Sequence, residues 1–81
     1  MIYYVALPFV RVEGGLAPGE AAECPHAGAA IRRAEAMSRN EANAGAVAFA
    51  RIDSPDLSDL EDAMILKTFG DVPDDFISVS T

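Results

Sequence analysis

The segment Ile2–Val12 limits the possible folds of this chain most strongly, because it is apolar on both sides. It is rich in aromatic and β-branched residues, which favour a pleated strand over a helix. A strand with one solvated face alternates between apolar and polar residues, so we predict that both faces of this strand are covered. Pro8 lacks an amide donor, which predicts a β-bulge or a sheet edge in the second half of the strand. The two predicted faces are Ile2, Tyr4, Ala6 and Val10, and Tyr3, Val5, Leu7 and Phe9.

The segment Glu13–Cys24 is predicted to be a loop, because glycine and proline recur in it without a regular period. Apolar residues then follow at three- and four-residue intervals, which predicts an amphipathic helix over Pro25–Ala42 with proline at its first position. Asn43–Gly45 supplies residues that tolerate a left-handed helix terminus.

Two further strands are predicted, at Ala46–Ile52 and at Asp62–Phe69. Between them, Ser54–Glu61 is interpreted as an acidic loop or turn, although the spacing of Leu57, Leu60 and Met64 also fits the start of a helix. Gly70 should end the third strand. A turn beginning at residues 71–75 follows, and residues 78–81 are expected to fray.

These elements predict an α+β domain over residues 1–77, with a three-stranded antiparallel sheet and one amphipathic helix on one face. The expected strand order places the last strand in the middle, which makes every pair antiparallel. The expected core consists of Val5, Leu7, Phe9, Ala30, Ile31, Ala34, Val47, Phe49, Ile65 and Leu66. One helix covers one sheet face, so we predict a homodimer that covers the other. The alternative is that Glu13–Cys24 and the tail Val72–Val79 fold across that face.

Composition agrees with one small packed domain. The chain has 81 residues, of which 51% are hydrophobic and 23% are charged. Its net charge of −7 disfavours nucleic acid as a partner, since phosphate binding needs an excess of Lys and Arg. The only cysteine, Cys24, forms no internal disulfide, which suits the cytoplasm. We expect no export signal and no membrane span, because the apolar start has no basic residue before it and is half the length that a span needs.

Few residues are typical of a catalytic or ligand site. Cys24 and His26 stand next to Pro25 where the helix is expected to begin, and a helix N-terminus can activate a thiol. Their spacing matches no known nucleophile pair or metal motif, so a minor enzyme is the third hypothesis and no catalytic residue, cofactor or metal is assigned. Gly14–Gly15 lacks the pattern of a phosphate loop, and the acidic cluster after Ile52 lacks the spacing of a calcium loop.

The charges point to an interaction surface. Residues 1–52 hold five Arg and five Glu, while residues 53–81 hold eight acids and only Lys67, so the net charge lies in the last third. Such an asymmetry fits a solvated acidic edge or a surface that attracts a basic protein. The candidate interaction residues are Arg32, Arg33, Arg39, Asp56, Asp59 and Asp62. The first hypothesis is therefore a non-catalytic protein-interaction module. The second is a protein that binds a small molecule or an anion through Arg32, Arg33 and the glycine-containing loop.

Five strings also resemble a family of small bacterial proteins to which no function is assigned. They are Tyr4–Phe9, Glu23–Pro25, Ala29–Glu35, Gly45–Phe49 and Phe69–Asp75. The resemblance spans most of the chain and implies no activity and no site residue.

Overall fold

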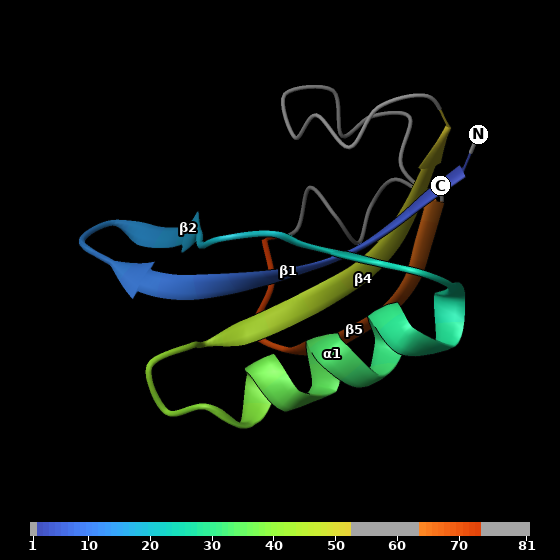
Figure 1. Cartoon of the computed structure of the whole chain (residues 1–81). Coiled ribbons are helices and arrows are strands. Elements are labelled where there is room, and N and C mark those ends of the chain that lie inside the picture. Colours follow the sequence, from blue (N-terminus) through green and yellow to red (C-terminus); the bar gives the residue numbers. More distant parts are fainter. Residues whose placement is uncertain (1, 53–63, 74–81) are drawn as a thin grey trace.

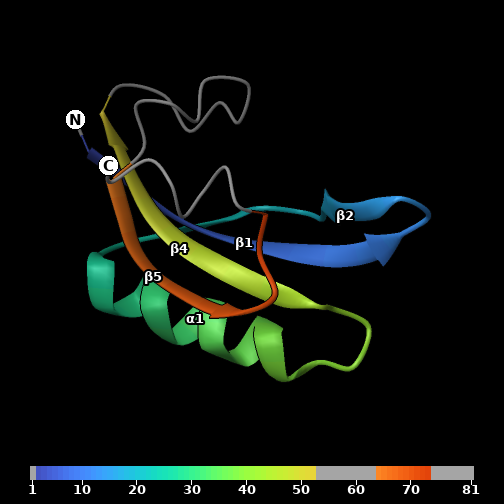
Figure 2. The ribbon, with the colours of Figure 1, turned by 180° about the vertical axis from the view of Figure 1, so that it is seen from behind.

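The computed structural model describes residues 2–52 and 64–73 and packs one helix against an antiparallel sheet (Figure 1). This confirms the α+β class, but the described residues form five strands where three were predicted. The elements in chain order are β1 Ile2–Val12, β2 Gly15–Pro18, β3 Ala22–Cys24, α1 Ala27–Arg39, β4 Gly45–Ile52 and β5 Met64–Gly70. Figure 2 shows the helix from behind, on one side of the curved sheet.

The strand order is β2-β1-β4-β5, with β3 also paired to β1. The prediction that the last strand lies in the middle is therefore wrong, because β4 lies between β1 and β5. β4 pairs with β1 over eight residues, from Ile2 opposite Ile52 to Phe9 opposite Gly45. Residues 45–51 of β4 are all buried, whereas β5 exposes Met64 and Lys67. The more uniformly apolar segment occupies the central position, as burial on two faces requires.

The two additional strands come from the segment Glu13–Cys24, which the sequence had predicted to be a loop. Glu13 and Gly14 form a two-residue turn in which Gly14 has φ +92°, and β2 then returns along β1. Phe9 lies opposite Pro18 and Ala6 lies opposite Ala22, so one extra residue stands on the returning strand between these pairs. β2 and β3 are thus two parts of one outer strand separated by a bulge.

The bulge lies beside Pro8, as the missing amide predicts. The carbonyl of Pro8 accepts a hydrogen bond of 2.8 Å from the amide of Gly19, so its backbone faces β2 and β3. In an antiparallel strand the N–H and C=O of one residue point to the same side, so the missing donor also faces the interruption. The pairing of Pro8 with Ala46 on the other side is unaffected.

Helix α1 is shorter at both ends than the predicted Pro25–Ala42. His26 is the N-cap, with an extended backbone and a ring Nδ1 that accepts from the amide of Ala29 at 3.1 Å, so Pro25 precedes the helix. Asn40 is the C-cap and is also extended rather than left-handed. The Asn43 side-chain amide donates to the carbonyl of Met37 at 2.9 Å, which satisfies a carbonyl of the last turn.

The cap at His26 gives a stability prediction. We expect His26→Ala to lower the free energy of unfolding by about 1 kcal/mol, because the amide of Ala29 loses its acceptor. His26→Asp should retain most of the stability, since aspartate is a strong N-cap and places negative charge at the helix N-terminus. Urea unfolding followed by circular dichroism measures both. Equal losses for the two variants would show that the ring packs rather than caps.

Small side chains form the layer between α1 and the sheet. Ala6, Ala30, Ala34, Ala46 and Ala48 are fully buried and form one cluster, against which Tyr4, Cys24, Ile31, Met37, Leu66 and Phe69 pack. Alanine at each facing position allows the helix to lie close to the strands. The predicted helix face is therefore confirmed, although Ile31 and Leu66 are only partly buried.

The opposite sheet face carries the larger side chains. Its buried cluster is Val5, Leu7, Phe9, Val47, Phe49 and Val72, with Leu16, Ala21 and Ile65 packed against it. Residues 5–9 of β1 are thus buried on both faces within one chain, as the sequence predicts, while Ile2 and Val12 at its two ends are exposed. Leu16 and Ala21 belong to the supposed loop and Val72 follows β5, so this part of the cover matches the alternative in which the chain folds over its own sheet. The homodimer stays a prediction, although the sheet face that suggested it is packed by residues of the same chain.

β5 begins at Met64 and contains a bulge at Leu66. Ala48 lies opposite Lys67 and Phe49 lies opposite Ile65, so Leu66 is the extra residue and packs on the helix side. Arg11 forms an exposed ion pair with Asp71 just beyond the strand. The predictions for Ser54–Glu61, for helix or strand at residues 57–64 before Met64, and for residues 78–81 lie outside the described residues. The domain limit at residue 77 also lies there.

Candidate functional site

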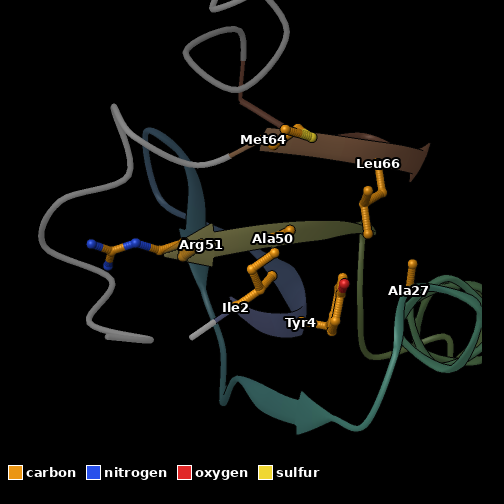
Figure 3. A pocket seen from close by; sticks show the side chains of 7 residues that line it. All are labelled: Ile2, Tyr4, Ala27, Ala50, Arg51, Met64 and Leu66. Atoms are coloured by element: carbon orange, nitrogen blue, oxygen red, sulfur yellow. The ribbon is translucent and has the colours of Figure 1, made fainter. Parts of the chain in front are cut away.

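An apolar pocket of about 300 Å³ opens on the helix side of the sheet, where β1 and α1 both begin (Figure 3). Four elements contribute to it. Its lining residues are Ile2 and Tyr4 of β1, Ala27 of α1, Ala50 and Arg51 of β4, and Met64 and Leu66 of β5. A concave apolar site with a few polar groups is the usual form of a binding site in proteins.

The pocket lies where α1 no longer covers the sheet. Ala6, Ala46 and Ala48 lie under α1, whereas Tyr4 and Ala50 are the next residues of the same sheet face beyond it. α1 begins at Ala27, which is itself a lining residue. Ala27 and Ala50 are small, so they leave space between the helix start and the sheet. The bulge in β5 turns Leu66 toward the same space.

Two exposed apolar side chains extend the pocket onto the surface. Ile2 is 54% exposed and Met64 is 67% exposed, and both rank among the large hydrophobic residues that face solvent. Figure 3 shows them on either side of Ala50, one from β1 and one from β5. A contiguous apolar patch around a pocket is typical of an association surface, whereas single exposed apolar residues are ordinary.

The polar lining residues do not form a catalytic group. Tyr4 is partly buried and brings one phenol to the pocket. Arg51 is 6% exposed, and Figure 3 shows its guanidinium directed away from the other lining side chains. Arg51 follows Ala50 in β4, so its side chain faces the other side of the sheet although the residue lines the pocket. The arrangement is suited to binding an apolar group.

The structure gives Cys24 and His26 structural contacts. His26 caps α1, and the thiol of Cys24 donates to the carbonyl of Ala22 at 3.6 Å while packing in the helix-side cluster. Within residues 2–52 and 64–73, no group of three or more His, Cys, Asp and Glu side chains is placed to hold a metal ion.

The three arginines among the predicted interaction residues do not line the pocket. Arg32, Arg33 and Arg39 are exposed on α1, and Arg39 forms a salt bridge of 3.4 Å with Glu35 one turn earlier. The turn that contains Gly14 lies at the tip of the β1–β2 hairpin, which projects beyond the C-terminal end of α1 (Figures 1 and 2). Asp56, Asp59 and Asp62 lie outside the described residues.

Sequence reasoning missed Ile2, Tyr4, Ala27, Ala50 and Met64 as site residues. Each was interpreted as part of a regular element, and their proximity depends on where the helix starts relative to the sheet. The only available signal was the pairing of small residues at Ala27 and Ala50 with large apolar residues at Ile2 and Met64.

Comparison with known proteins adds no relative. Neither the family models, nor the curated proteins, nor the solved structures contain a significant match to this chain. In the part of the chain that the structure describes, no helix is long and apolar enough to cross a membrane.

Proposed function

We propose that this chain is a non-catalytic protein-interaction module whose pocket receives an apolar side chain of a partner protein. The observation that carries the proposal is the pocket between Ala27 and Ala50, flanked by the exposed side chains of Ile2 and Met64. Protein interfaces commonly join an anchoring side chain to a pocket and surround it with apolar contacts that exclude water. The expected setting is the cytoplasm, because the single cysteine forms no internal disulfide.

The size of the pocket favours a side chain over a larger ligand. Its volume of about 300 Å³ is at the lower end of the range for small-molecule sites. Ile2 and Met64 offer additional apolar contact outside the pocket, which a small ligand seated inside would leave in water. A peptide that inserts one side chain and lies across the rim covers both.

The alternative function is anion binding at the start of α1. Arg32 favours it, because its Nη1 lies 4.0 Å from the position that a Cβ on Gly28 would occupy, so the guanidinium reaches back over the first turn. This reading requires that inorganic phosphate shifts the amide NMR signals of Ala27 and Gly28, and that Arg32→Gln abolishes the shift. Gly14 and Gly15 of the glycine-containing loop are not part of this proposed site, because they lie where β1 turns into β2.

A peptide-display experiment tests the interaction module. Peptides are selected from a random library on the wild-type protein and then measured against Ala27→Leu, which fills the pocket with added apolar volume. We expect affinity to fall at least about tenfold, equivalent to about 1.4 kcal/mol, because the anchoring side chain loses its space. Ala36→Leu is the matched control, since Ala36 lies on the exposed side of the same helix.

Thermal unfolding must show that both leucine variants are folded before binding is compared. Met64→Glu provides a second test that adds no volume, and its 67% exposure makes a folding defect unexpected. Peptides that bind Ala27→Leu and Met64→Glu as tightly as the wild type would contradict the proposal. Failure to enrich any peptide would also contradict it.

The homodimer is the competing use of the same surface. A protruding Met64 beside a pocket is compatible with a two-fold contact in which each copy fills the other. Sedimentation at micromolar concentration distinguishes the two readings. A species of twice 8.5 kDa that Met64→Glu dissociates would assign the pocket to a second copy.

A further inference from the structure

Tyr4 supplies the polar group of the pocket. Figure 3 shows its side chain extending from β1 between Ile2 and Ala27, with the oxygen at the end toward Leu66. Arg51, the other polar lining residue, directs its guanidinium away from these side chains. Among the described residues the Tyr4 hydroxyl has no hydrogen-bond partner, and none of the lining side chains is acidic. The pocket therefore offers one hydroxyl to an uncharged ligand that is otherwise apolar.

The volume of the pocket exceeds what one aliphatic side chain fills. A closed apolar cavity of about 150 Å³ holds one benzene molecule, and this pocket measures about 300 Å³. Space left empty beside a ligand forfeits dispersion contacts along the walls. A bicyclic aromatic ring is therefore a better match to the volume than an aliphatic side chain or a single benzene ring.

The floor and the rim of the pocket suit a flat ring. Ala50 lies between Ile2 and Met64 in Figure 3, so a small side chain separates two large ones. Met64 is 67% exposed, and a thioether makes favourable contacts with the edge of an aromatic ring. A planar ring that rests on Ala50 thus has an apolar contact on each side.

We propose that the anchor of the partner protein is a tryptophan whose indole N–H donates to the hydroxyl oxygen of Tyr4. The inference rests on the proposed function and names the anchoring side chain. Indole is bicyclic, uncharged and carries a single donor, so it matches both the volume and the one hydroxyl of the pocket. Tryptophan is also among the residues that most often anchor protein interfaces. Tyr4 is then a specificity-determining residue, because an anchor without a donor leaves its hydroxyl unpaired against an apolar surface.

Fluorescence of a tryptophan probe tests the anchor directly, because the chain itself contains no tryptophan. The probe is N-acetyltryptophanamide, titrated with the protein up to millimolar concentration. We expect its emission to shift to shorter wavelength as the indole leaves water, and we expect Ala27→Leu to abolish the shift. Ala36→Leu, on the exposed side of the same helix, should retain it. An unshifted emission with the wild-type protein would overturn the proposal.

Two matched changes test the hydrogen bond. The benzothiophene analogue of the probe replaces the indole N–H by sulfur, and on the wild-type protein we expect it to bind about fivefold more weakly in competition. Tyr4→Phe removes only the hydroxyl, and it should weaken the tryptophan probe by a similar factor without weakening the analogue. Tyr3→Phe is the control, since Tyr3 is next to Tyr4 and faces the other side of β1. Equal affinities of the two probes for the wild-type protein would contradict a bond between the indole and Tyr4.

The peptide-display experiment separates this inference from the function on which it rests. Tryptophan should recur at one position of the peptides selected on the wild-type protein. If a different apolar residue recurs there and Ala27→Leu weakens those peptides, the interaction module is supported and the tryptophan anchor is wrong. If Ala27→Leu weakens no selected peptide, the interaction module itself is wrong. A second copy of the chain has no tryptophan to insert, so a dimer that Met64→Glu dissociates would overturn the proposal.

Discussion

Gly45→Ala should prevent stable folding or lower the free energy of unfolding by more than about 3 kcal/mol. A Cβ at this position would lie 2.5 Å from the amide nitrogen of Asp71 and 2.5 Å from the carbonyl oxygen of Phe69, and it would also meet the carbonyl of Asp71. All three are backbone atoms, so no side chain can rotate away. Backbone hydrogen bonds from Ala44 to Phe9 and from Asp71 to Ala44 hold both chains in place.

Gly28→Ala is the control for this prediction. A Cβ on Gly28 meets the ring of His26 at 3.4 Å, which is ordinary contact, and the residue lies in the first turn of α1. We expect Gly28→Ala to be neutral or to stabilise the protein by up to about 1 kcal/mol, because alanine favours the helix. Thermal and urea unfolding measure both variants. A Gly45→Ala protein as stable as Gly28→Ala would show that β4 and β5 do not approach so closely.

Phe49→Ala should cost about 3–5 kcal/mol of stability, a large part of the total for a small domain. Phe49 is fully buried at the centre of β4 and belongs to the cluster on the sheet face opposite α1. In a chain of 81 residues few other side chains are available to close the resulting cavity. Denaturant unfolding should show a lower midpoint with an unchanged slope if the native state stays compact.

Phe69→Ala provides the comparison, because it removes the same ring from the neighbouring strand. Phe69 is only partly buried, and the Lys67 ammonium lies 5.3 Å from its ring centroid. We expect a loss of about 1–2 kcal/mol, since less apolar area returns to water and an exposed cation–π contact contributes little. Equal losses at the two positions would mean that the face opposite α1 is no better packed than the outer strand.

The parts of the fold that depend on alternation or period were predictable. The two faces of β1 follow from the two-residue alternation of a strand, which packing did not override. One face carries Val5, Leu7 and Phe9, and the other carries Tyr4 and Ala6. The alanines of α1 followed from the helical repeat. Pro8 predicted the position of an irregularity, because a missing backbone donor has the same consequence in any sheet.

The errors have a different physical origin. The segment Glu13–Cys24 is rich in turn residues, yet it pairs with β1. The backbone N–H and C=O groups at the edge of an apolar strand need hydrogen-bond partners, and the backbone of almost any sequence can supply them. A prediction that β4 lies between β1 and β5 requires a comparison of how uniformly apolar the whole strands are. The pocket depends on where α1 starts, which the side chain of His26 sets by accepting from Ala29.

The irregular outer strands also affect how the molecule meets its copies in a crowded solution. One outer strand of the described sheet consists of β2 and β3, which a bulge separates. The outer strand on the other side is β5, which contains a bulge and a lysine in mid-strand. A regular, uncharged edge strand pairs readily with strands of other molecules and so promotes fibril growth. The bulges and the lysine oppose such pairing. Contacts with other molecules are then made by side chains on the faces of the sheet. Such contacts depend on the residue types of both molecules, whereas backbone pairing is open to any protein.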